Sequence, residues 1–176
     1  MARDTAGLEK LGAMDARLHA FLDAWREARG TRIVPLRKAF DPLSVPSLLS
    51  NIYIYKWDPD QGDYICELAG EVVNDAYGRR IKGDTLAGIV GLEDHQTIID
   101  RWGRILGVPC IHYGSINESL SKRPMQRAER LLLPFESRPG LRDTIIGVGL
   151  YSERPSWPDQ PPLMPSDILQ IPCADF

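Results

Sequence analysis

Between Leu49 and Gly78, the pattern of apolar and polar residues predicts a β-hairpin that leads directly into a short helix. Residues 49–57 are rich in β-branched and aromatic side chains, 58–63 consist of turn formers, and 64–69 return as a second strand. After Gly70, apolar residues recur at helical spacing as far as Gly78, which suits a left-handed helix cap. A hairpin followed by a helix across its own face forms a shallow cup, and this cup is the candidate site.

The chain after this cup is predicted to form helices first and strands afterwards. Short helical turns over 79–90 precede a longer helix over 92–106, and three strands follow over 110–120, 129–136 and 144–151. In the first strand, Ile52 and Ile54 alternate with Tyr53 and Tyr55, so both faces carry large side chains. We therefore expect both faces of the sheet to be covered, one by the central helices and the other by the N-terminal helix or a second subunit.

The N-terminal segment, residues 1–30, is predicted to be an amphipathic helix. Leu11, Leu18, Leu22 and Trp25 belong to one apolar stripe, and Gly30 is a natural stop. Two interpretations stay open for this stripe. It packs on the chain's own domain, or it forms a homodimer contact, since its spacing near seven residues also serves a partner helix.

The remaining chain divides into a core domain over 31–152 and a Pro-rich tail over 153–176. The tail contains many of the chain's prolines and is expected to be extended. Four of its apolar residues are candidates for docking on the sheet or on a partner, namely Trp157, Leu163, Ile168 and Leu169.

Composition and charge narrow the classes of function. The formal net charge is -3, which argues against nucleic acid as a partner, and no apolar run is long enough for membrane insertion. The three cysteines, Cys66, Cys110 and Cys173, are far apart in the sequence and include no CxxC pair, so we expect reduced, buried thiols. With no hydrophobic signal segment at the N-terminus, a cytoplasmic protein is expected.

Four motifs in order resemble one known family. They are FLDAWREARGTRIVPLRKAFDP over 21–42, VPSLLSNIYIYKWD over 45–58, YICELAG with NDAYGRRIKG over 64–83, and RAERLLLPF over 127–135 with the later IIGVG. Together with the predicted element order, they resemble a bacterial family of stand-alone PAS domains. The resemblance implies an α+β fold with a five-stranded antiparallel sheet and helices on one face. It also implies a bacterial sensory or interaction domain with a possible small-molecule cavity and no catalytic residues.

The sequence departs from this family at one place. The family usually has an Arg-Leu-x-Gly-Thr run where this chain has 67–71, which begins with Glu67 and ends with Glu71. An arginine that would contact an anionic ligand is therefore missing from that run.

A PAS-like cup would be lined by the inner face of the sheet and by the central helices. The alternation of side chains predicts eight ligand-binding residues: Cys66, Leu68, Tyr77, Ile98, Trp102, His112, Ile146 and Val148. A filled apolar core without a ligand is the alternative, because these positions must be largely apolar in either case.

The identity of any cofactor stays open. His95, early in the long central helix, could act as a haem ligand, although its polar neighbours favour a surface histidine. A flavin photosensor of the covalent type is not expected, because Cys66 and Cys110 fall on predicted strands and not on the helices after the hairpin. Phosphate-binding loops and hydrolase motifs are absent from the sequence, as is the HExxH zinc motif.

The favoured function is a non-catalytic sensor that binds a small ligand or an unknown signalling protein. One alternative is a ligand-free interaction or dimerisation module. A further alternative is a small cone-shaped enzyme of the NTF2-like kind, with acid–base residues drawn from Asp75, Tyr77, His112 and Tyr113. The order of elements argues against the enzyme, because the hairpin precedes the central helices.

Overall fold

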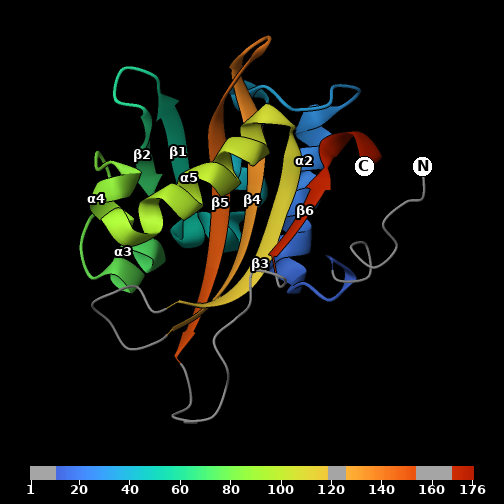
Figure 1. The fold of residues 1–176 in the computed structure, drawn as a ribbon. Helices are drawn as coiled ribbons and strands as arrows, with labels where there is room; N and C mark the ends of the chain where they lie inside the picture. The colour runs from blue at the N-terminus through green and yellow to red at the C-terminus, as the bar shows by residue number, and fades with distance from the viewer. Residues whose placement is uncertain (1–10, 119–125, 154–167) are drawn as a thin grey trace.

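The computed structural model describes residues 11–118, 126–153 and 168–176, which form one sheet with helices on both of its faces (Figure 1). The helices are α2 (Ala16–Arg29), α3 (Glu71–Tyr77), α4 (Leu86–Val90) and α5 (Leu92–Gly107). The strands are β1 (Ile52–Asp58), β2 (Asp63–Ala69), β3 (Cys110–Glu118), β4 (Gln126–Arg138), β5 (Leu141–Glu153) and β6 (Ile168–Pro172). Short 3₁₀ helices are η1 (Arg37–Ala39), η2 (Pro42–Ser44), η3 (Pro46–Asn51) and η5 (Cys173–Asp175).

The sheet has six strands in the order β2-β1-β5-β4-β3-β6, and all neighbouring strands are antiparallel. The predicted hairpin and the three later strands are confirmed. The predicted number of five strands is wrong by one, because Ile168–Pro172 of the tail pairs with β3 and extends the sheet. The paired backbone of β6 satisfies the edge of β3 that would otherwise be exposed.

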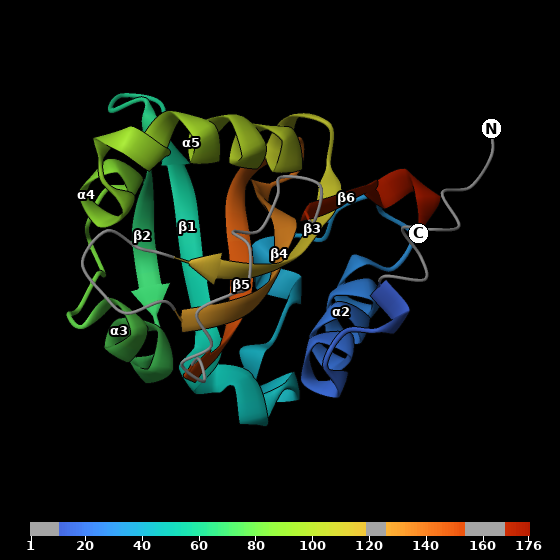
Figure 2. The same ribbon diagram turned by 60° about the horizontal axis from the view of Figure 1, so that its bottom comes forward.

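Two helical layers cover the two faces of the sheet. Helices α3, α4 and α5 lie across β2, β1 and β5, whereas α2 packs on the opposite face (Figure 2). Gly78 ends α3 in the left-handed conformation with φ of 67°, as predicted. The expectation that the N-terminal helix covers the second face is therefore met within one chain.

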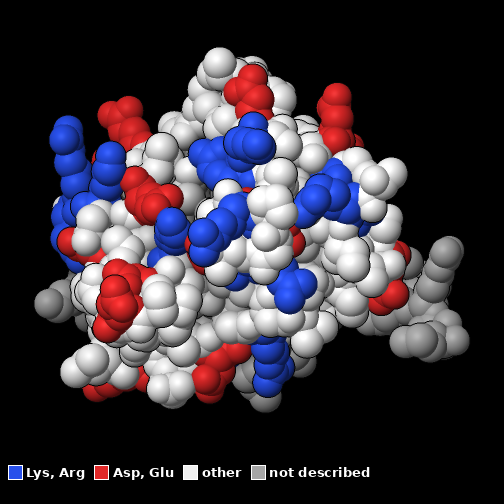
Figure 3. All heavy atoms as spheres, turned by 90° about the horizontal axis from the view of Figure 1, so that it is seen from above, with Lys and Arg blue, Asp and Glu red and all other residues white. Residues whose placement is uncertain are grey.

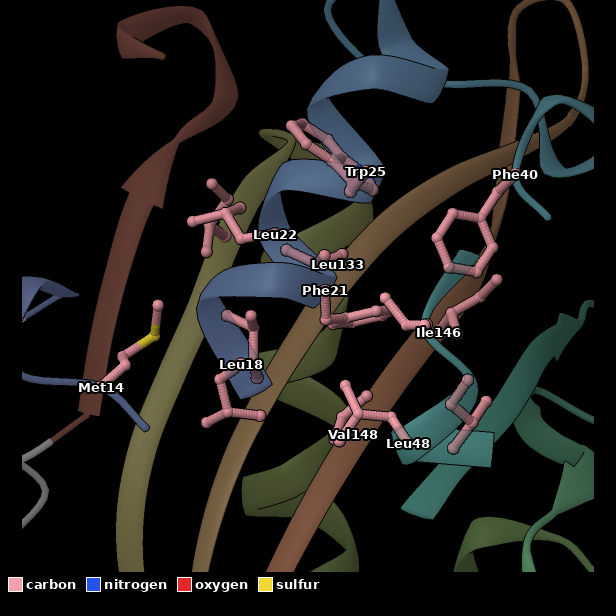
Figure 4. Packing of buried hydrophobic residues seen from close by; sticks show 14 of the residues in the cluster. Met14, Leu18, Phe21, Leu22, Trp25, Phe40, Leu48, Leu133, Ile146 and Val148 are labelled. Carbon is pink, nitrogen blue, oxygen red and sulfur yellow. The ribbon is translucent and has the colours of Figure 1, made fainter. Parts of the chain in front are cut away.

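Helix α2 begins later than the apolar stripe predicted, because Asp15 caps it by accepting a hydrogen bond from the Arg17 amide. Its buried side chains, Leu18, Phe21, Leu22 and Trp25, pack against the sheet (Figure 4). The indole of Trp25 also donates to the carbonyl of Pro134 over 3.0 Å.

This packing favours the first of the two interpretations of the apolar stripe, in which it packs on the chain's own domain. Leu11, Leu18, Leu22 and Trp25 are all buried within the monomer, and Leu22 is only 2% exposed. They are core residues of this chain and are not available to a partner helix while α2 stays in place.

The C-terminal residues contact both α2 and β3. Ile168 and Leu169 belong to β6, whereas Trp157 and Leu163 lie outside the described residues. Arg29 of α2 donates to the carbonyl of Cys173 over 2.9 Å. The last residues of the chain are thus fixed to α2 as well as to β3.

Candidate functional site

A cavity of about 270 Å³ lies between the sheet and the layer of α3, α4 and α5. It is larger than the engineered apolar cavity of about 150 Å³ that binds benzene, and slightly below the usual range for ligand sites of about 300–1,000 Å³. Its walls combine aromatic and aliphatic groups with a few charged ones. The lining residues are Tyr53, Tyr55, Val73, Tyr77, Leu86, Val90, Asp94, Thr97, Ile98, Arg101, Trp102, His112, Gly114, Arg130, Leu132 and Tyr151.

Two glycines of β5 lie beneath tyrosines that line the cavity. A Cβ atom added at Gly147 would lie 2.3 Å from the Tyr53 ring, and one added at Gly149 would lie 2.8 Å from the Tyr151 ring. Both tyrosine rings therefore lie directly over glycine backbone, where any other residue would push them away from the sheet. The glycines let these rings lie close to the sheet, which leaves space between the rings and the helices.

One wall of the cavity is an aromatic cluster that joins the hairpin to α5. The Trp102 ring packs edge-on against Tyr55 at 4.9 Å and against Tyr64 at 5.2 Å between centroids. Burial of the Tyr55 hydroxyl raises its pKa well above the ordinary value, so this phenol stays neutral. The wall is thus uncharged and held by edge-to-face contacts.

Two arginines from different elements add positive charge. Arg101 comes from α5 and Arg130 from β4, and both line the cavity. The Arg130 guanidinium donates to the Tyr77 hydroxyl over 3.4 Å and stacks 5.6 Å from the centroid of Tyr151. Arg130 therefore links α3 to the sheet beside the cavity.

His112 of β3 is a buried polar group of the site, at 5% exposure. The Gln170 side-chain amide contacts His112 Nδ1 at 3.1 Å and donates to the carbonyl of Arg101, also at 3.1 Å. Because a carbonyl only accepts, this Gln170 atom is the nitrogen, and His112 Nδ1 is then the acceptor. Burial, with repulsion from Arg101 and Arg130, lowers the pKa of His112 to about 4, so the ring is neutral near pH 7.

The helices over the cavity are anchored by Asp63 at the start of β2. Its carboxylate accepts from His95 Nε2 over 3.0 Å and from the Ala87 amide over 3.1 Å. These bonds fix α4 and α5 to the hairpin. His95 is thus a half-buried structural residue that does not line the cavity, which differs from both the haem-ligand and the exposed-surface interpretations.

The eight predicted ligand-binding residues separate into four groups. Tyr77, Ile98, Trp102 and His112 line the cavity, and Cys66 is buried in the same layer without lining it. Leu68 does not line it and is 41% exposed.

Ile146 and Val148 lie on the opposite face, in the core beneath α2 (Figure 4). This corrects their predicted place. Both faces of β5 are apolar in sequence, so the alternation did not reveal which face turns toward the cavity.

Sequence reasoning missed the charged residues and most of the tyrosines. Arg101 and Arg130 belong to elements far apart in the sequence, and each reads as an ordinary exposed arginine. Tyr151 carried a signal that was available, since Gly147, Gly149 and Tyr151 occupy alternate positions of one strand and therefore share a face.

The four residues considered for an acid–base enzyme do not come together. Tyr77 and His112 line the cavity, whereas Tyr113 packs on the α2 side, where its hydroxyl donates to Glu129 over 2.9 Å. Asp75 is exposed on α3.

Metal sites, membrane-spanning helices and surface charge bear on other classes of function. Within residues 11–118, 126–153 and 168–176, no group of His, Cys, Asp and Glu could hold a metal ion. In the same part of the chain, no helix is long and apolar enough to cross a membrane. Seen from above, the surface carries basic and acidic side chains together, with many of the basic ones near the middle (Figure 3).

The family model of the PAS domain called PAS_5 matches residues 14–150, so the chain belongs to this family of PAS domains. This confirms the resemblance drawn from the sequence motifs. No curated protein matches the chain.

Two solved structures are similar at low identity. A fungal LOV domain photoreceptor shares 12% identity with a TM-score of 0.46, and the match covers 85% of this chain and 100% of that one. A variant of RsLOV shares 15% identity with a TM-score of 0.41, and the match covers 81% of this chain and 72% of that one. At these values they add nothing to the family assignment.

Proposed function

We propose that the chain is a sensory PAS domain that binds a small molecule in the cavity and passes this state to another protein without catalysing a reaction. The match to the PAS domain family supports a sensory role. The observation that carries the proposal is the cavity of about 270 Å³ between the sheet and α3–α5, with polar groups at a few points of a mostly apolar wall.

The arrangement of the polar groups supports binding over catalysis. His112 is neutral near pH 7, with its Nδ1 occupied by Gln170, and Tyr113 faces the other side of the sheet. A general acid–base pair needs two groups within reach of the same substrate atom.

Signal output through another protein, including a second copy of this chain, is part of the proposal. The route supported best runs through β6, because Gln170 contacts the cavity residue His112 while Arg29 of α2 holds the following Cys173 carbonyl. A ligand that shifts His112 would therefore act on both the C-terminal end and α2. A cytoplasmic location is supported by three buried cysteines that form no disulfide.

The test is native mass spectrometry of freshly purified protein beside its denatured mass. Added mass that disappears on denaturation is expected for the wild type. Ile98→Trp should lose it, because Ile98 lines the cavity, and Gln96→Trp, on the exposed side of the same helix, should keep it. Bare protein in all three samples, with no ligand found on screening, would favour the ligand-free interaction module.

A further inference from the structure

We propose that the cavity selects small organic monocarboxylates with an aromatic or aliphatic body. This inference rests on the proposed function and goes one step further, since it names the chemical class of the ligand. It is carried by the arginines, the neutral donors and the apolar walls that meet in this one cavity.

The first argument is the presence of two guanidinium groups. Arg101 and Arg130 both line the cavity, and Arg101 forms no ion pair within the described residues. Guanidinium is the protein group that best matches the planar, two-oxygen geometry of a carboxylate.

The second argument is that the nearby neutral groups are hydrogen-bond donors. Since His112 Nδ1 accepts from Gln170, the proton of the neutral ring resides on Nε2, which offers an N–H. Tyr53, Tyr77 and Tyr151 also line the cavity, and each carries a hydroxyl of the type that can donate a hydrogen bond. A site rich in donors favours a ligand that accepts hydrogen bonds.

The third argument is the charge of the site. Arg101 and Arg130 contribute two positive charges and Asp94 one negative, while His112 and Tyr55 are neutral. The lining therefore carries a net charge of one positive unit, which matches a monoanion better than a dianionic phosphate or a cation.

The fourth argument is the shape and polarity of the remaining wall. Val73, Leu86, Val90, Ile98 and Leu132 line the cavity with apolar groups, beside the aromatic rings already described. A volume of about 270 Å³ exceeds the space that holds a benzene ring, so a single ring or a short alkyl chain with a carboxylate has room.

The experiment compares carboxylic acids with their own amides by isothermal titration calorimetry near pH 7. The pairs are benzoate and benzamide, phenylacetate and phenylacetamide, and hexanoate and hexanamide, which keep the body and remove the charge. The variants are Arg101→Gln, Arg101→Lys and, as a matched control, Arg104→Gln, which changes an exposed arginine on the same helix.

At least one acid should bind about tenfold or more tightly than its amide, as expected for a charge-assisted hydrogen bond. Arg101→Gln should remove this preference, Arg101→Lys should retain part of it, and Arg104→Gln should leave it unchanged. Amides that bind as well as acids would overturn the monocarboxylate proposal and leave the sensor proposal standing. Binding of none of the compounds, with no added mass in the native spectrum, would overturn both.

Discussion

Gly147→Ala is expected to destabilise the fold by forcing the Tyr53 ring off the sheet. The added Cβ would lie 2.3 Å from Cε2, 2.4 Å from Cζ and 2.7 Å from the hydroxyl oxygen of Tyr53, its cross-strand neighbour. Gly147 does not have a positive φ, so the backbone itself accepts alanine. The cost then comes from displacing the side chain of Tyr53, a residue that is 4% exposed and lines the cavity.

Overpacking of this kind costs about 1–3 kcal/mol. Urea unfolding followed by circular dichroism should show that loss of unfolding free energy for Gly147→Ala. The m-value, the dependence of this free energy on urea concentration, should be unchanged. Gly103→Ala is the matched control, since Gly103 lies inside α5 and an added Cβ meets nothing within 4 Å. It should gain about 0.5–1 kcal/mol from helix propensity.

A double-mutant cycle isolates the contact between the two residues. On a Tyr53→Ala background, Gly147→Ala should cost about 1 kcal/mol less than on the wild type, because the clashing ring is gone. An equal cost on both backgrounds would refute the claim that Gly147 is needed to make room for the Tyr53 ring against the sheet.

Three further predictions concern the core, the buried histidine and the thiols. Leu22→Ala should lose about 2–5 kcal/mol in urea unfolding without changing the molecular mass in solution; a changed mass with unaltered stability would contradict the core placement. Since the folded pKa of His112 is about 4 against an ordinary 6.5, its contribution is fully present above pH 6.5 and is lost as pH falls toward 4. This loss of unfolding free energy between pH 6.5 and pH 4 is roughly 3 kcal/mol. Urea unfolding at each pH should show it in the wild type, and the His112→Asn variant should lack this part of the pH dependence. Burial raises the pKa of the thiols to about 11 for Cys66 and Cys110 and about 12 for Cys173, so Ellman's reagent should react with them at pH 8 only after unfolding; immediate reaction in the native protein would show open thiols.

The sequence was sufficient to predict the element order, because each hairpin and helix carries its own local pattern. The strand over 52–58 and the helix over 92–107 were both visible as periodicities, and Gly78 marked a helix end. Local patterns also identified the apolar stripe of α2. They did not reveal that Asp15, the polar residue that interrupts this stripe, starts the helix as its N-cap.

The parts that could not be predicted depend on contacts between distant segments. In β5, Ile146 and Val148 alternate with Gly147 and Gly149, and the sequence analysis assigned Ile146 and Val148 to the cavity side. The structure reverses this, because α2 buries the larger residues while tyrosines fill the space over the glycines. Likewise, β6 is too short to stand out after a Pro-rich run, and only pairing with β3 reveals it.

The most direct test of the account is a crystal structure of the protein purified without added ligand and grown without small carboxylates. The account predicts density for a bound organic molecule between the sheet and α5, with a carboxylate near Arg101 and Arg130. A cavity closed by inward rotation of Tyr53 and Trp102, leaving no room for a ligand, would contradict it.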